Sequence, residues 1–159
     1  MAIEVRAARR DDRTFIFELG EATANSSFSN LRPPPLEDPG SSFRYFAEQL
    51  LAFSQTVSFI AEQDGKPAGF LIMLTDMHDE VTRGEQGFVA FVAVEKKARR
   101  RGVARRLLKA AEDEARRRSL PHLSLMVTAS NHHARSLYAR EGFVDERIQM
   151  TKPLRRAAS

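Results

Sequence analysis

The chain has 159 residues, of which 42% are hydrophobic and 29% charged, as in an ordinary globular protein of one domain. It has no cysteine, which excludes a disulfide framework, a thiolate nucleophile and a zinc site built on cysteine. The longest apolar run, Phe88–Val94, is too short to span a bilayer, and the N-terminus lacks the apolar core of a signal peptide. We therefore expect one cytoplasmic domain over residues 1–159, with a core over 3–153 and a flexible basic tail at 154–159.

The charge is unevenly distributed. The formal net charge is +4, but the segment Lys96–Arg118 alone carries eleven basic and three acidic residues, so the remainder of the chain is net acidic. A protein that binds nucleic acid or membranes in general usually spreads its basic surface more widely. One basic segment in an otherwise acidic chain indicates a compact anionic ligand.

The first third of the chain predicts one strand and two helices. Alternation predicts a strand over Ile3–Ala7, and an acidic cap predicts a helix over residues 11–20. Four prolines predict a loop over Asn25–Ser42, and apolar residues at helical spacing predict a helix over Phe43–Phe53.

The middle of the chain predicts strands over Val57–Glu62 and Ala68–Thr75, joined by a hairpin turn that contains Asp-Gly. The run Phe88–Val94 predicts a buried central strand. Apolar residues every four positions predict an amphipathic helix over Gly102–Arg118, and alternation predicts a strand over Leu123–Val127.

The last third predicts a short helix over Asn131–Glu141, which Gly142 ends. Residues Phe143–Val144 and Ile148–Thr151 then predict a closing hairpin. Strands and helices in this order indicate a mixed sheet with helices packed on it, in an α/β (α+β) domain.

The segment between the central strand and the long helix has the features of an anion site. Amides at a helix N-terminus lack intrahelical partners and carry the positive end of the helix dipole. Gly102 would let the backbone approach a phosphate, and Arg99–Arg101 add positive charge. The segment matches neither the P-loop nor the dinucleotide fingerprint. Taken alone, it could equally be a solvated basic turn in which Gly102 supplies only its dihedral angles.

Two segments have specific patterns: the first is Arg99-x-x-Gly102-x-Ala104, and the second is Asn131-x-x-Ala134-x-x-Leu137-Tyr138-x-x-x-Gly142-Phe143. Together they resemble the GNAT family of acyl-CoA-dependent N-acetyltransferases, whose pyrophosphate loop is similar to the first pattern. The opening Ile3-x-Val5-Arg6-x-Ala8-x-x-x-Asp12 also resembles the first strand and helix start of the family. Ala104 stands where glycine is commoner, and Lys96 where proline is frequent.

The resemblance implies a GNAT-like fold, with a mixed and mostly antiparallel sheet of about seven strands flanked by about four helices. It implies direct transfer of an acetyl group from acetyl-CoA, without a metal, to a primary amine of a small molecule or of a peptide or protein. It also implies a set of residues that hold the coenzyme: Arg99, Arg100, Arg101, Gly102, Val103, Ala104 and Arg105 at the pyrophosphate, Val92, Ala93 and Val94 along the pantetheine arm, and Asn131.

Tyr138 is the predicted general acid. It lies seven residues after Asn131, two turns along the same side of the helix. If Asn131 contacts the pantetheine, as the resemblance implies, Tyr138 can meet the thioester end and protonate the leaving sulfur. By itself, the helix would favour a core-packing role for this ring.

The general base is less evident. An alkylamine of pKa ~10.4 is only about 0.04% neutral at pH 7, so attack on the thioester requires deprotonation. The predicted strand over residues 86–94 has no carboxylate. Glu85 is the nearest candidate, with Asp79 and Glu80 behind it, and a water relay is equally compatible.

Two other functions stay open: a nucleic-acid-binding module that uses Lys96–Arg118, and a CoA-binding sensor without catalysis. The acidic balance of the remaining chain favours a cationic acceptor, and the family resemblance allows a homodimer. We expect no nucleic-acid and no membrane partner. We also expect no metal, since His132 and His133 cannot face one ion and residues 76–80 lack the spacing of metal ligands.

Overall fold

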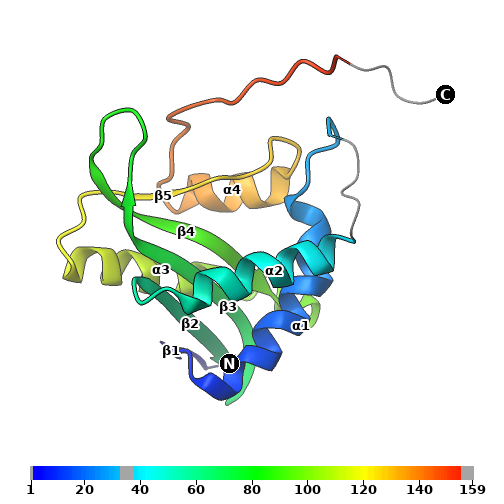
Figure 1. Cartoon of the computed structure of the whole chain (residues 1–159). Helices are drawn as coiled ribbons and strands as arrows, with labels where there is room; N and C mark the ends of the chain where they lie inside the picture. The colour runs from blue at the N-terminus through cyan, green and yellow to red at the C-terminus, as the bar shows by residue number, and fades with distance from the viewer. Residues whose placement is uncertain (1, 33–37, 155–159) are drawn as a thin grey trace.

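The computed structural model describes residues 2–32 and 38–154 (Figure 1). Within these residues, one sheet has its strands in the order β1-β2-β3-β4-β5. The first four strands pair antiparallel, and β5 pairs parallel to β4. The strands are β1 (Ile3–Ala7), β2 (Thr56–Gln63), β3 (Lys66–His78), β4 (Glu85–Val94) and β5 (Leu123–Leu125).

Two hydrophobic cores lie on the two faces of the sheet. One joins the sheet to α1 and α2, and the other joins it to α3 and α4. The helices are α1 (Arg13–Thr23), α2 (Pro39–Ala52), α3 (Val103–Arg117) and α4 (His132–Arg140). Each face of the central strands β3 and β4 is therefore covered, as their apolar sequences require.

Two glycines permit close approaches between these layers. A Cβ on Gly69 of β3 would lie 2.8 Å from the Ala93 carbonyl oxygen and 3.1 Å from Val103 at the start of α3. A Cβ on Gly20 of α1 would overlap the Phe43 ring of α2. The close packing of α3 on the sheet and of α1 on α2 thus requires residues without a side chain at these two positions.

The structure confirms the α/β fold class and the four helices, but the expected strand number was wrong. About seven strands were expected, and the described residues form five. The predicted closing hairpin of Phe143–Val144 with Ile148–Thr151 does not form. An ion pair of Asp145 with Arg135 joins this segment to α4, and an ion pair of Arg147 with Asp79 joins it to the β3–β4 turn. Residues 143–154 instead leave the body as an extended arm, the C-terminal arm (Figure 1).

The predicted loop over Asn25–Ser42 was also partly wrong, because α2 begins at Pro39. Proline suits the first turn of a helix, where its missing N–H would have no partner. The Asp38 side chain caps the same end by accepting from the Ser41 amide at 3.1 Å. Residues 33–37 of that loop and 155–159 of the predicted tail lie outside the described residues. None of the helices in the described part is long and apolar enough to cross a membrane.

Candidate active site

A bulge in β4 sets up the site. Ile72 of β3 pairs with Phe91 and Met73 pairs with Val89, so Ala90 is an extra residue without a partner on β3. As a result Val89 packs in the α3-side core, whereas Phe91, only two positions later, packs in the core of α1 and α2. A bulge of this kind bends a strand and frees a backbone group from the ladder.

Beyond this bulge, no strand of the described part of the chain lies on the outer side of β4. The parallel pairing with β5 covers only Gly87–Val89 opposite Leu123–Leu125. Val92, Ala93 and Val94 pair with β3 alone, and their side chains are directed into the two cores. Their outward backbone groups can therefore pair with an extended ligand, as an added strand would.

The turn that follows β4 ends in free backbone amides at the start of α3. Gly102 caps α3 without a side chain, at φ +86°, and Arg100 also has a positive φ of +63°. The amide of Arg106 donates to the Gly102 carbonyl at 3.0 Å, whereas those of Val103, Ala104 and Arg105 have no acceptor among the described residues. A Cβ on Gly102 would meet nothing within 4 Å. The turn thus offers free donors around an open space, which suits a phosphate group.

The arginines of this turn reach in different directions. The Arg99 side chain turns back and donates to the Val94 carbonyl at 3.3 Å. Arg105 lies 3.4 Å from Glu141, an ion pair that joins the first turn of α3 to the end of α4. The side chains of Arg100 and Arg101 are exposed. Positive charge therefore surrounds the free amides and adds to the field of the helix dipole.

Asn131 caps α4, with its side-chain oxygen accepting from the Ala134 amide at 3.2 Å. That bond uses the oxygen, so the amide nitrogen is the group with which Asn131 can donate to a ligand. The preceding segment is tied to the region after α1, because the Thr128 hydroxyl donates to the Ser27 carbonyl at 3.1 Å. The start of α4 is thereby held beside the connection between α1 and α2.

Tyr138 is half-buried and packs against the α3-side core and the ring of Phe143, with ring centroids 5.9 Å apart. Burial raises the pKa of its phenol above the ordinary value, because the charged form would lose its hydration. The hydroxyl has no hydrogen-bond partner among the described residues. A phenol that stays protonated at neutral pH and has an uncommitted hydroxyl is suited to donating a proton.

The candidate bases do not gather at the bulge. Glu85 is exposed, faces His78 across the hairpin, and lies five residues before Ala90, or about 16 Å along an extended strand. Asp79 forms an ion pair with Arg147 at 2.6 Å and accepts from the Thr82 amide, interactions that hold its pKa well below the usual range. Asp79 is thus engaged in structural contacts, and neither of these two carboxylates lies at the bulge.

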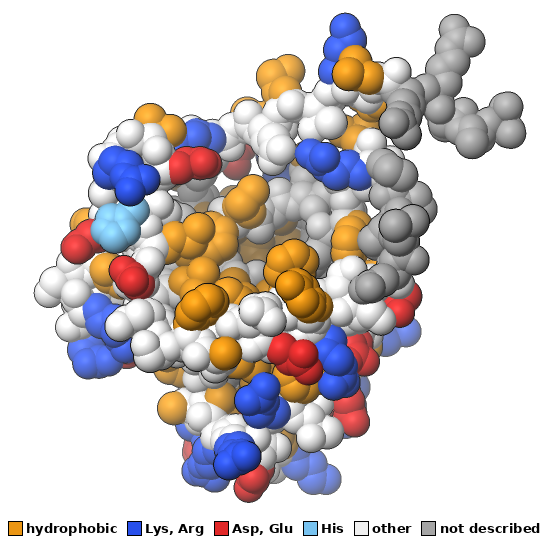
Figure 2. All heavy atoms as spheres, in the orientation of Figure 1, with side chains coloured by type: hydrophobic (Ala, Val, Ile, Leu, Met, Phe, Trp, Pro, Cys, Tyr) orange, Lys and Arg blue, Asp and Glu red, His pale blue; other side chains and the backbone are white. Residues whose placement is uncertain are grey.

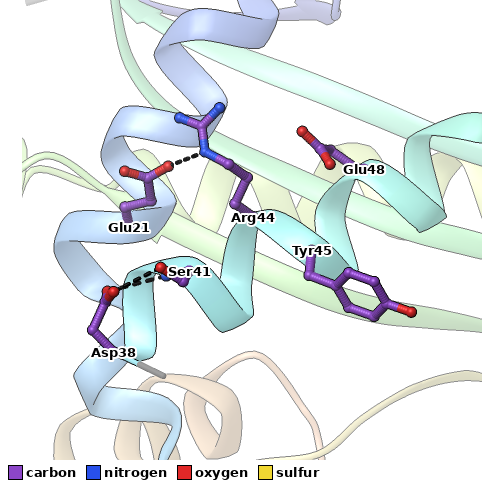
Figure 3. A pocket seen from close by; sticks show the side chains of 6 residues that line it. All are labelled: Glu21, Asp38, Ser41, Arg44, Tyr45 and Glu48. Atoms are coloured by element: carbon purple, nitrogen blue, oxygen red, sulfur yellow. Dashed lines mark hydrogen bonds and ion pairs between the residues drawn. The ribbon is translucent and has the colours of Figure 1, made fainter. Parts of the chain in front are cut away.

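The surface beside the site is hollowed and mostly apolar. Figure 2 shows hydrophobic side chains gathered in this hollow, between α2 on one side and the C-terminal arm on the other. A smaller depression of about 390 Å³ lies between α1 and α2 and is lined by Glu21, Asp38, Ser41, Arg44, Tyr45 and Glu48 (Figure 3). Two of its carboxylates have partners, Glu21 with Arg44 and Asp38 with Ser41. No group of three or more metal-ligating side chains occurs in the described ranges.

Sequence reasoning missed the bulge at Ala90 and the contact between Thr128 and Ser27. The bulge left no signal in the sequence, because a strand covered on both faces is a continuous apolar run with or without a bulge. The contact had none, because it joins residues 101 positions apart.

Comparisons with known proteins agree on one family. The model of the acetyltransferase (GNAT) family matches residues 25–143. The chain is 32% identical over 101 residues to N-alpha-acetyltransferase 30 of Schizosaccharomyces pombe, a match that covers 64% of this chain and 63% of that protein.

Solved structures show the same fold at lower identity. A Pyrococcus furiosus protein thought to be an acetyl transferase superposes with a TM-score of 0.80 at 21% identity, over 96% of this chain and 100% of that one. The aminoglycoside N-acetyltransferase AAC(6')-Iy in complex with CoA superposes with a TM-score of 0.73 at 19% identity, over 95% of this chain and 94% of that one. With the family model matching about three-quarters of its residues, the chain belongs to the acetyltransferase (GNAT) family.

Proposed function

We propose that this protein transfers the acetyl group of acetyl-CoA directly to a primary amine. One observation carries the proposal: the open backbone edge of Val92–Val94 leads into a turn with three free amides around Gly102. Coenzyme A offers a matching shape, because its amide-bearing pantetheine arm is continuous with a pyrophosphate. Family membership and the CoA complex of AAC(6')-Iy, with the same fold, support this ligand.

In this proposal the coenzyme lies along β4 with its phosphates at the turn. The amides of Gly102, Val103, Ala104 and Arg105 hold the pyrophosphate together with Arg99, Arg100 and Arg101. Val92, Ala93 and Val94 pair with the pantetheine arm, and Asn131 donates to it. An extended arm that starts at the turn brings its thioester along β4 toward the bulge at Ala90.

The chemical step is an addition followed by an elimination. The neutral amine nitrogen attacks the thioester carbonyl carbon, and the tetrahedral intermediate collapses with cleavage of the carbon–sulfur bond. Tyr138 donates its phenolic proton to the departing sulfur, so that CoA leaves as the free thiol. The attacking nitrogen loses one proton, and the phenolate is reprotonated from water, which balances the reaction.

The proton of the acceptor ammonium leaves through water. The distance from the bulge to Glu85 requires more than one water molecule, so Glu85 acts as the terminal base of a relay. A chain without cysteine also cannot form a cysteinyl acyl-enzyme. The lack of cysteine therefore supports direct transfer in a ternary complex.

The proposed acceptor is a small molecule or a peptide or protein N-terminus that carries a positive charge. Relatives of both kinds support this range, since one is named as an N-alpha-acetyltransferase and another as an aminoglycoside N-acetyltransferase. The acidic depression between α1 and α2 supports a cationic acceptor. A cytoplasmic location, a homodimeric state and the lack of a nucleic-acid partner are parts of the same proposal.

The charges on α3 argue against the nucleic-acid alternative. The basic side chains toward its C-terminal end pair with nearby carboxylates: Lys109 with Asp113, Arg116 with Glu112, and Arg117 and the C-cap Arg118 with Glu114. A surface of alternating charge is a poor match for a polyphosphate backbone.

Titration calorimetry with acetyl-CoA, followed by a screen of amines that detects free thiol, tests the proposal. Micromolar binding and a raised Tm are expected, because a ligand of the native state stabilises it. Absence of binding at millimolar coenzyme would overturn the proposal. Binding without turnover on any amine would favour the silent sensor, and salt-sensitive binding of mixed-sequence DNA would favour the nucleic-acid module.

A further inference from the structure

The face of the sheet that carries α1 and α2 extends beyond these two helices. Leu74 of β3 follows Met73, which packs in the α3-side core, so Leu74 lies on the opposite face. Phe88 of β4 pairs with Leu74 and therefore shares that face. Both side chains are half-buried, and both belong to neither hydrophobic core. The two helices thus leave an apolar part of the sheet uncovered.

The segment of β5 continues this uncovered area. The Ser124 hydroxyl donates to Gln86 Oε1 of β4 at 2.6 Å, and the Thr128 hydroxyl reaches the Ser27 carbonyl after α1. Met126 lies midway between Ser124 and Thr128, so alternation places it on the same face, where it is 75% exposed. Together with Met77, which pairs with Gln86, these residues form the floor of the hollow in Figure 2. We define the floor as Leu74, Met77, Gln86, Phe88, Ser124 and Met126.

The floor has no ionisable side chain. Its two polar side chains, Ser124 and Gln86, are bonded to each other. At its border, the carboxylate of Asp79 is paired with Arg147 of the C-terminal arm. The acidic depression between α1 and α2 is a separate surface with other lining residues. A hollow that is mostly apolar and has few polar groups is typical of a site for a small ligand or a side chain.

The floor lies next to the bulge in β4. Phe88 is two residues before Ala90, or about 7 Å along an extended strand. The other face of the sheet is closed at this point, since a Cβ on Gly87 would lie 3.0 Å from Met73 and 3.2 Å from Leu123. An acceptor therefore reaches the bulge across the floor, and the group that carries its amine rests there.

We propose that the acceptor carries its primary amine on an apolar group, either aliphatic or aromatic, that packs on this floor. This inference rests on the proposed acetyl transfer. The floor binds such a group by removing its surface from water, and it rejects a polar group that would lose its hydration. Apolar surroundings also favour the neutral amine over the ammonium, and the neutral form is the one that attacks. A further positive charge on the acceptor would lie outside the floor.

Two pairs of acceptors test the proposal by release of free thiol. Butylamine and propanolamine differ by a methyl against a hydroxyl group, and two peptides differ by leucine against asparagine as the first residue. The kcat/KM should be about 10–100-fold higher for the apolar member. A preference within one pair alone would identify the acceptor as a small amine or as a peptide. Equal values within both pairs, or higher values for the polar members, would overturn the proposal.

Calorimetry of the same four compounds with the CoA-saturated protein separates this proposal from the proposed function. Tighter binding of the apolar members without turnover would support the floor and count against acetyl transfer. Equal binding without turnover would overturn both.

A variant on the floor locates the preference. Met126→Lys places a charge there and should reduce the apolar preference about 10-fold or more, whereas Met126→Leu should keep it. Val81→Lys is the matched control, because Val81 is 69% exposed and lies in the β3–β4 turn, outside the floor. Equal reductions by the two lysine variants would overturn the assignment of the preference to the floor.

Discussion

The proposed coenzyme end and acceptor end of the site differ in what builds them. At the coenzyme end, the turn from β4 to α3 depends on backbone features: the positive φ of Arg100 and Gly102 and the free amides that follow. At the acceptor end, α1 and α2 present side chains, such as the pair of Glu21 and Arg44, on regular helices. A site made of backbone requires particular residue types at a fixed spacing, whereas a site made of side chains can change without altering the fold.

The largest effect should follow from Gly102→Glu. The new carboxylate would enter the space beside the free amides and repel the pyrophosphate, so we expect acetyl-CoA affinity to fall by a factor of about 1000, a few charge-assisted hydrogen bonds. Gly65→Glu is the matched control, because Gly65 has a φ of +79° and a Cβ there also meets nothing within 4 Å. Calorimetry measures the affinity of each variant for acetyl-CoA. An equal loss of affinity in both variants would mean that backbone strain at a positive φ, and not a charge beside the free amides, causes the effect.

A smaller loss is expected from Tyr138→Phe, which removes the proton donor and keeps the ring packed against Phe143. The kcat should fall about 10–1000-fold, the range for a lost acid, with coenzyme affinity and Tm nearly unchanged. Tyr45→Phe changes the only other tyrosine, on the acceptor side, and should leave kcat alone. An unaltered kcat in Tyr138→Phe, under conditions where chemistry limits the rate, would assign Tyr138 to packing only.

Asp12→Asn should lower the stability of the fold without changing the binding of coenzyme or acceptor. The buried Asp12 carboxylate accepts from the Arg6 guanidinium at 2.8 and 3.0 Å and from the Arg9 amide at 2.6 Å, which lowers its pKa. Loss of these charge-assisted bonds should cost about 1–3 kcal/mol at neutral pH.

A lowered pKa in the folded state gives stability that is present above the unfolded value of 3.8 and lost as pH falls through the folded value. The Tm difference between wild type and Asp12→Asn, measured by calorimetry, should therefore shrink below pH 4. A difference that persists at pH 2 would mean that packing, and not the charge of Asp12, stabilises this corner.

The smallest effect is expected at the acceptor end. Glu48→Gln should raise KM about 2–5-fold for a cationic acceptor and leave KM for acetyl-CoA unchanged, since one exposed carboxylate contributes little. Asp64→Asn, in the turn between β2 and β3, is the control for the same loss of charge. A change in the coenzyme KM would contradict the separation of the two ends.

The sequence predicted the helix after β4 and its glycine cap closely. The helix expected over Gly102–Arg118 is α3, at Val103–Arg117, because its apolar period and its glycine cap are both local features. The arm could not be predicted in the same way. Local alternation indicated a hairpin, but the ion pair of Arg147 with Asp79 joins residues far apart in the chain, and nothing local records it.

The placement of the candidate base was equally hidden from the sequence. Glu85 is adjacent to the apolar run of β4, and only the register of β4 against β3 shows how far it lies from the bulge. The bulge itself is a relation between two strands, so a single run of apolar residues cannot reveal it.

The bulge at Ala90 also bears on how this gene can change. Val89 faces α3 and Phe91 faces α1 and α2, so these two residues already lie on opposite faces, as neighbours in a regular strand do. Removal of the Ala90 codon would therefore restore a regular strand and leave the residues from Phe91 to Val94 on their present faces. Both cores would keep their residues, and only the bend and the unpaired backbone group at Ala90 would be lost. We expect such a deletion variant to fold, so an in-frame deletion at this position separates the contribution of the bulge to the site from the contribution of the cores to stability.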